Sequence, residues 1–131
     1  MTERRAKYNA NGLPTEHEEQ KALFAWAAYN EGKWPELKRM FAIPNGGHRH
    51  VKVAMRMKEE GVKAGVPDIF LPAARCGWHG LFVELKVGRN KPTELQAEWL
   101  EDLTLEGYLA VTCWGFDEAA ALIESYLEDN K

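Results

Sequence analysis

Hydrophobic residues recur along this chain with two periodicities, one typical of helices and one typical of strands. The helices are expected at about 15–30, 49–60, 93–106 and 117–127, and the strands at about 37–43, 65–72, 80–86 and 108–113. The first helix begins with Thr15 as its N-cap and Glu18 three residues later, which is a capping-box pattern. The third helix begins at Asn90 or at Thr93, and Thr93 has Gln96 at the matching position.

The order of these elements favours an α/β fold. A strand, a helix and a strand follow one another between Val83 and Val111, and two strands connected through a helix run parallel. We therefore expect a mixed central sheet with helices on both faces.

Apolar residues at helical spacing indicate which side of each helix packs inward. In the second helix the helical spacing falls at Val51 and Met55, with Val53 as a further candidate. The inward stripe of the third helix is expected to be Leu95, Trp99, Leu100 and Leu103. The remaining arc of the second helix is basic. Trp114, at the end of the last predicted strand, is expected in the core or in an interface.

Three ionisable residues interrupt the two apolar strands in the middle of the chain. Asp68 lies in the first strand, and Glu84 and Lys86 lie in the second. A carboxylate inside an apolar strand is costly unless it is paired, hydrogen-bonded or coordinated to a cation. Side chains two residues apart share a face, so Glu84 and Lys86 point the same way, and a hairpin would bring Asp68 beside Glu84. The alternative is an exposed row of charges, with Asp68 beginning a turn.

These residue types suit a metal-dependent hydrolytic site. Mg²⁺ or Mn²⁺ prefers oxygen ligands and keeps some water, which Asp68, Glu84 and the backbone carbonyl of Leu85 would provide. A lysine on the same face, Lys86, would hold or deprotonate the attacking water and stabilise charge on a phosphate. The sequence therefore predicts metal-assisted hydrolysis of a phosphodiester.

Length and composition fit a single domain. The chain has 131 residues, of which 45% are hydrophobic, and residues 14–131 are expected to form that domain after a flexible arm over residues 1–13. The two cysteines, Cys76 and Cys113, have no metal-ligand spacing and suit a reducing, cytoplasmic environment. No run of residues approaches the length of a membrane span.

Charge is unevenly distributed along the chain. Residues 33–75 carry a net charge of +5, whereas residues 76–131 carry −7. The basic segment suits contacts with a phosphate backbone, although a merely solvated face is the alternative. The residues expected to bind DNA, together with a later basic turn, are Asn45, His48, Arg49, Lys52, Arg56, Lys63, Arg89 and Lys91. Asn45 and the glycines after it also suit a tight turn without any DNA contact.

Several blocks of the sequence resemble a known nuclease family. Pro67-Asp68 followed by Glu84-Leu85-Lys86 resembles the signature of the PD-(D/E)xK nuclease superfamily. Together with Glu16 and Gln20, residues 43–47, and Gln96, these blocks resemble the VRR-NUC family, the virus-type replication-repair nucleases. The resemblance spans residues 14 to about 112 and implies a restriction-endonuclease-like core.

The resemblance also implies roles for individual residues. It assigns metal binding to Asp68 and Glu84, catalysis to Lys86, an acidic metal-binding or catalytic role to Glu16, and a place beside the site to Gln96. For Glu16, stabilisation of the helix dipole is the alternative.

At the level of function, the resemblance implies a Mg²⁺-dependent DNA endonuclease, with Mn²⁺ able to substitute. It further implies a small phage or prophage type that acts as a homodimer on branched DNA such as a Holliday junction. Two rivals stay open at this point. One is a flap or restriction-type nuclease, which would share the site, and the other is a DNA-binding module without catalysis.

Overall fold

The computed structural model describes residues 14–44 and 50–128, which contain a four-stranded sheet. Its strands are β1 (Phe41–Ala42), β2 (Ile69–Leu71), β3 (Leu81–Lys86) and β4 (Leu109–Trp114), in that spatial order. The pairs β1–β2 and β2–β3 are antiparallel, and β3–β4 is parallel. The mixed sheet and its parallel crossover are confirmed. The arm predicted for residues 1–13 lies outside the described residues.

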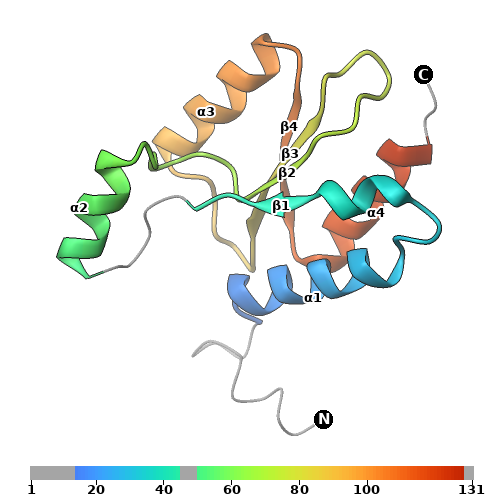
Figure 1. The fold of residues 1–131 in the computed structure, drawn as a ribbon, viewed down its shortest axis with the longest axis horizontal. Helices are drawn as coiled ribbons and strands as arrows, with labels where there is room; N and C mark the ends of the chain where they lie inside the picture. Colours follow the sequence, from blue (N-terminus) through green and yellow to red (C-terminus); the bar gives the residue numbers. More distant parts are fainter. Residues whose placement is uncertain (1–13, 45–49, 129–131) are drawn as a thin grey trace, which may run out of the picture.

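Four helices surround the described part of the sheet: α1 (Glu16–Tyr29), α2 (Val51–Glu59), α3 (Glu94–Leu105) and α4 (Phe116–Glu128). Figure 1 shows α1 and α4 on one side of the sheet, α3 on the other, and α2 projecting from the body. The α/β class with helices on both faces is therefore confirmed. No helix in residues 14–44 and 50–128 is both long enough and apolar enough to cross a membrane.

The two faces of the sheet differ in composition. Leu81, Val83 and Leu85 of β3 are at most 1% exposed and join the core formed with α1 and α4. Residues in the alternate positions point to the other face, where the rings of Phe70 and Phe82 stack with their centroids 4.3 Å apart. The face under α3 therefore carries both an aromatic cluster and the charged residues of β3.

Side-chain caps fix the starts of α1, α2 and α3, and the sequence predicts those of α1 and α3. The hydroxyl of Thr15 accepts the backbone N–H of Glu18 at 3.1 Å. Thr93 and Gln96 form a complete capping box, so α3 begins after Thr93 and not after Asn90. The Nδ1 atom of His50 accepts the backbone N–H of Lys52, which caps α2.

Two predicted strands are shorter than expected. In place of a strand over 37–43, residues Pro35–Arg39 form a 3₁₀ helix and only Phe41–Ala42 are extended in the sheet. Pro35 at the start of this 3₁₀ helix favours helical backbone. Leu37, within the same 3₁₀ helix, is buried. In the second case Gly65 adopts φ +90° and Pro67 has no N–H, so β2 is limited to Ile69–Leu71.

The apolar side of α2 is exposed, and the inward stripe predicted for α3 is half-buried at Trp99, Leu100 and Leu103 but exposed at Leu95. Val51 and Met55 are 69% and 59% exposed, and Leu95 is 45% exposed. No side chain of α2 or α3 is buried within the described part of the chain. The periodicity identifies an apolar side, but α2 projects from the body and has no layer to pack against (Figure 1).

Candidate active site

The β2–β3 hairpin brings two acidic residues together. Ile69 pairs with Val83, so the same register places Asp68 opposite Glu84. The Oδ2 atom of Asp68 accepts the backbone N–H of Leu85 at 2.7 Å. This bond fixes the Asp68 carboxylate against β3, as expected if the two strands form a hairpin.

Glu84 and Lys86 are buried side by side on the face opposite the core. The Nζ atom of Lys86 lies 3.4 Å from Oε2 of Glu84, and the Glu84 side chain is 1% exposed. Leu85 between them is fully buried in the core. The alternative of an exposed charged row is therefore wrong, because both charged residues are shielded from water.

One oxygen of this site lacks a partner. Oε1 of Glu84 is buried and makes no hydrogen bond within residues 14–44 and 50–128. A buried carboxylate oxygen without a partner is costly, and a hydrogen bond or a cation is what relieves that cost. The ion pair with Lys86 therefore satisfies only half of the Glu84 carboxylate.

Burial is the largest cause of a raised pKa at both acidic groups, and nearby negative charge adds to it. Burial, and then the charge of Asp68, raises the pKa of Glu84 to about 7, although Lys86 opposes the shift. Burial also raises the pKa of Asp68, while the N–H of Leu85 opposes that shift. The site therefore places two carboxylates, both poorly solvated, beside a single lysine, which is an environment that attracts a cation.

Glu16 stands near this pair from the first turn of α1. Its charge contributes to the raised pKa of both Asp68 and Glu84. In the described residues, however, no three side chains of His, Cys, Asp or Glu form a group that could hold a metal ion. Glu16 is therefore brought near the pair without completing a three-carboxylate cluster, and both its metal-binding and its helix-dipole roles stay predictions.

The backbone carbonyl of Leu85 fits the role predicted for it. The N–H of Leu85 points toward β2, where it meets Asp68, and within a strand the N–H and C=O of one residue point to the same side. Extending the register of β2 and β3 puts Pro67 opposite Leu85. Since proline has no N–H to donate, this carbonyl is turned toward the acidic pair without a ladder donor from Pro67.

These groups fit a hard divalent cation. Two carboxylates, one with a buried unpaired oxygen, and a backbone carbonyl supply oxygen ligands, and water would complete the shell. The predicted Mg²⁺ is therefore compatible with the residues present.

Gln96 is engaged in the cap of α3. Its side-chain oxygen accepts the backbone N–H of Thr93 at 2.8 Å. The amide NH₂ group and the second lone pair of the oxygen are left for the role beside the site that the sequence predicts, and this role stays a prediction.

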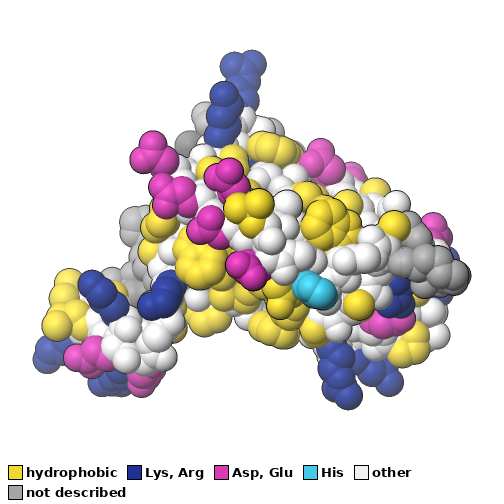
Figure 2. Space-filling model, turned by 90° about the horizontal axis from the view of Figure 1, so that it is seen from above, with side chains coloured by type: hydrophobic (Ala, Val, Ile, Leu, Met, Phe, Trp, Pro, Cys, Tyr) yellow, Lys and Arg dark blue, Asp and Glu magenta, His cyan; other side chains and the backbone are white. Residues whose placement is uncertain are grey.

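The predicted DNA-binding residues fall into two exposed groups. Lys52 and Arg56 lie on α2 and Lys63 follows it, whereas Arg89 and Lys91 lie in the turn between β3 and α3. Figure 2 shows Lys and Arg side chains on the projecting part of the molecule at lower left, with acidic side chains among them, and side chains of both signs on the main body. The predicted contacts Asn45, His48 and Arg49 lie outside the described residues.

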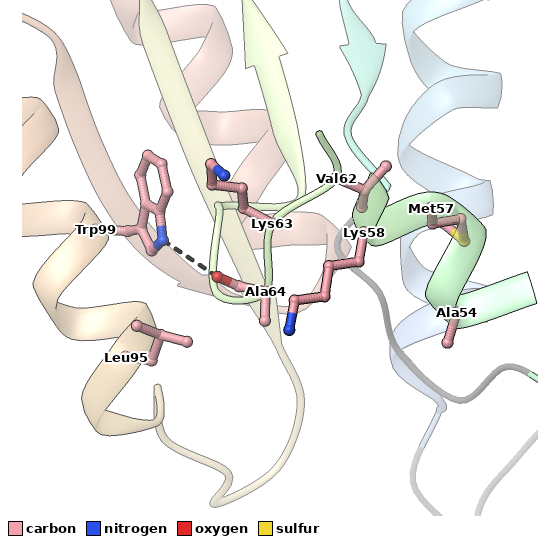
Figure 3. Close-up of a pocket in the computed structure, with 8 residues that line it drawn as sticks. All are labelled: Ala54, Met57, Lys58, Val62, Lys63, Ala64, Leu95 and Trp99. Atoms are coloured by element: carbon pink, nitrogen blue, oxygen red, sulfur yellow. Dashed lines mark hydrogen bonds between the residues drawn. The ribbon is translucent and has the colours of Figure 1, made fainter. Parts of the chain in front are cut away.

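A groove separates α2 from α3 and was not anticipated from the sequence. It has a volume of about 620 Å³ and is lined by Ala54, Met57, Lys58, Val62, Lys63, Ala64, Leu95 and Trp99. Figure 3 shows side chains of α2 facing those of α3 across it, and the indole N–H of Trp99 donating to the carbonyl of Ala64. Of the apolar residues that line the groove, Leu95 and Trp99 belong to the stripe predicted for α3, whereas Ala54 and Met57 of α2 lie outside the predicted spacing.

Comparison with known proteins identifies close likenesses. A family model described as VRR-NUC domain matches residues 7–117. A solved structure described as "VRR_NUC domain protein" is 32% identical, with a TM-score of 0.75, and the match covers 89% of this chain and 91% of that chain. No match was found among the curated proteins.

Proposed function

This chain belongs to the VRR-NUC family, which implies a nuclease-type function, and we propose that it is a metal-dependent endodeoxyribonuclease. Asp68, Glu84 and Lys86 are the residues that carry the proposal. The observation that supports it best is the buried, unpartnered Oε1 of Glu84 beside a second carboxylate. A fold retains such an arrangement when a ligand supplies the missing interaction.

The proposed chemistry divides roles among these residues. Asp68 and Glu84, with the carbonyl of Leu85, would hold a Mg²⁺ ion, which Mn²⁺ could replace. When bound, Mg²⁺ supplies Lewis acidity toward water and toward a phosphate oxygen. The N–H of Leu85 orients Asp68 for binding.

Lys86 completes the site on the same face. Its ammonium group lies 3.4 Å from Oε2 of Glu84. From this position the ammonium of Lys86 would hold the attacking water and stabilise negative charge on the phosphate. To act as the base instead, Lys86 would first have to lose its own proton, and the neutral amine would then take up the proton of the water. No covalent intermediate with the protein is needed.

The substrate we propose is branched DNA of the Holliday-junction kind, cut by a homodimer. Two-fold symmetry would place one site on each of two strands of a junction. The exposed basic residues of α2 and of the turn after β3 support contact with more than one segment of phosphate backbone. A phage or prophage source and a cytoplasmic setting accompany this proposal.

Cleavage of labelled DNA tests the proposed activity. With Mg²⁺ the wild type is expected to cut a four-way junction, and Glu84→Ala and Lys86→Ala are each expected to lose about 100-fold or more in single-turnover rate. Glu101→Ala and Lys38→Ala remove matched charges from exposed positions and should leave the rate unchanged. If wild type and site variants bind every substrate alike and cut none, the non-catalytic DNA-binding module is the correct description.

The choice of substrate is decided in the same assay. Flaps, nicked duplex and plain duplex are compared with the junction at equal concentration. Faster cleavage of flaps or of duplex would replace branched DNA with a flap or restriction-type substrate while leaving the proposed site in place.

A further inference from the structure

Trp114 lies next to Lys86 at the end of the parallel β3–β4 pair. The register pairs Lys86 with Trp114 and Glu84 with Thr112. Paired residues of adjacent strands project from the same face of a sheet, and the strands are about 4.8 Å apart. Trp114 therefore stands on the face of the acidic site, as the immediate neighbour of its lysine.

The ring of Trp114 is fixed by a hydrogen bond of its indole N–H, and the residue is partly exposed. Its indole N–H donates to the carbonyl of Asn90 at 2.7 Å, and its backbone N–H donates to Oε1 of Glu118 at 2.9 Å. Even so, Trp114 is 40% exposed. The expectation that it lies in the core is wrong for this reason, and an interface role remains. Trp114 is thus held in a fixed orientation with part of its surface presented to solvent.

Two cations are the sequence neighbours of the residue that holds this ring. Asn90, which accepts the indole N–H, stands between Arg89 and Lys91 in the turn after β3, and both cations are exposed. An aromatic face with adjacent cations matches the two parts of a nucleotide, because a base stacks on the ring and a phosphate pairs with the cation. An apolar partner would gain nothing from the two cations.

We propose that Trp114 is a stacking platform for a nucleobase adjacent to the phosphodiester held at Glu84 and Lys86, with Arg89 and Lys91 on a flanking phosphate. The proposal rests on the proposed nuclease function and deepens it. A base inside a continuous duplex is covered on both faces by its neighbours, so the platform selects a base at a branch point, a flap or an end. Trp114 therefore positions the substrate and favours branched over plain duplex DNA.

Binding measurements on variants test this role without requiring cleavage. Affinity for a fluorescent four-way junction is measured by anisotropy in a chelator. Trp114→Ala is expected to weaken junction binding by about 5- to 100-fold, and binding of blunt plain duplex much less. Trp114→Phe keeps a ring and should lose less than Trp114→Ala. Tyr29→Ala is the control, since Tyr29 is 90% exposed at the end of α1 remote from Glu16 and should have no effect.

An abasic analogue at each nucleotide around the branch identifies the stacked base. At one position the analogue should weaken binding by the wild type but not by Trp114→Ala. This non-additivity is expected if the missing base and the Trp114 ring are in contact. Thermal unfolding of Trp114→Phe and Trp114→Ala verifies that both fold, and Trp114→Phe alone carries the comparison if Trp114→Ala does not.

Three results would overturn the platform. The first is that the effects of the abasic analogue and of Trp114→Ala on affinity are additive at every position. The second is that Trp114→Ala weakens binding to the junction and to plain duplex equally. The third is that Trp114→Ala changes the size of the protein particle and this change accounts for the whole loss of affinity. Because binding is read without Mg²⁺, a protein that shows the base-specific effect but cuts no DNA would refute the nuclease and retain the platform.

Discussion

The burial of Glu84 predicts an unusual dependence of stability on pH. Its carboxyl has a pKa of about 7 in the folded protein against an ordinary value of 4.5. The folded state therefore binds a proton more tightly than the unfolded state does. The contribution of this group to stability is largest below pH 4.5, declines as the pH rises through the interval up to about 7, and stays low above it.

The size of the effect follows from the same two values. Keeping Glu84 ionised inside the fold costs about 3 kcal/mol relative to the unfolded chain. This is a large part of the 5 to 15 kcal/mol by which domains are typically stable. Glu84→Gln has no proton to lose, so in a chelator it should equal the wild type near pH 4.5 and exceed it by about 3 kcal/mol at pH 8.

Urea unfolding followed by tryptophan fluorescence measures this difference. The midpoint and slope are recorded for both proteins from pH 4.5 to 8.5. Glu101→Gln removes an exposed carboxyl and serves as the control, with a curve parallel to that of the wild type. Mg²⁺ at pH 8 should then stabilise the wild type and leave Glu84→Gln nearly unchanged.

A specific result would refute the reasoning. If wild type and Glu84→Gln keep a constant stability difference across the whole range, the carboxyl is not buried with a raised pKa. If the difference depends on pH but Mg²⁺ stabilises both proteins equally, burial is correct and the cation binds elsewhere.

Three further predictions concern other parts of the molecule. Gly65→Ala should lower the free energy of unfolding by about 1 to 3 kcal/mol in urea titration, because Gly65 has φ +90° and an added Cβ would lie 2.7 Å from Cγ of Leu95. Gly32→Ala is the control, since an added Cβ at Gly32 would meet nothing within 4 Å. Thr93→Ala removes the cap of α3 and should cost about 1 kcal/mol, an effect that vanishes if the cap does not form in solution. Replacing Lys52, Arg56 and Lys63, which are proposed to contact DNA, with alanine should reduce the slope of log binding constant against log salt by about 2 to 3. An unchanged slope would exclude these residues from the proposed DNA contact.

The sequence predicted the centre of the site because the relevant information is local. Alternation along β3 separates Leu85 from Glu84 and Lys86, and the glycines and prolines around each strand limit the possible hairpin register. Asp68 therefore falls opposite Glu84 from strand pattern alone. The cap at Thr93 is local in the same sense, since it depends on residues three apart.

Other features depend on contacts between distant segments and were missed for that reason. The stripe of Val51 and Met55 shows that α2 has an apolar side, but not whether any layer lies against it. The position of Trp114 follows from its pairing with Lys86 across a helical crossover, and local pattern does not define such a register. The burial of the Glu84 side chain likewise depends on neighbours that are remote in sequence.

The design of β3 explains how the fold tolerates a site that destabilises it. Leu81, Val83 and Leu85 are almost completely buried on the core face, and each such side chain contributes about 1.5 to 3 kcal/mol. The three together outweigh the roughly 3 kcal/mol that ionised Glu84 costs on the opposite face. The strand can therefore form before any cation binds. It follows that the carboxylates are oriented before Mg²⁺ binds. The affinity for Mg²⁺ would then not be reduced by the free-energy cost of ordering the strand.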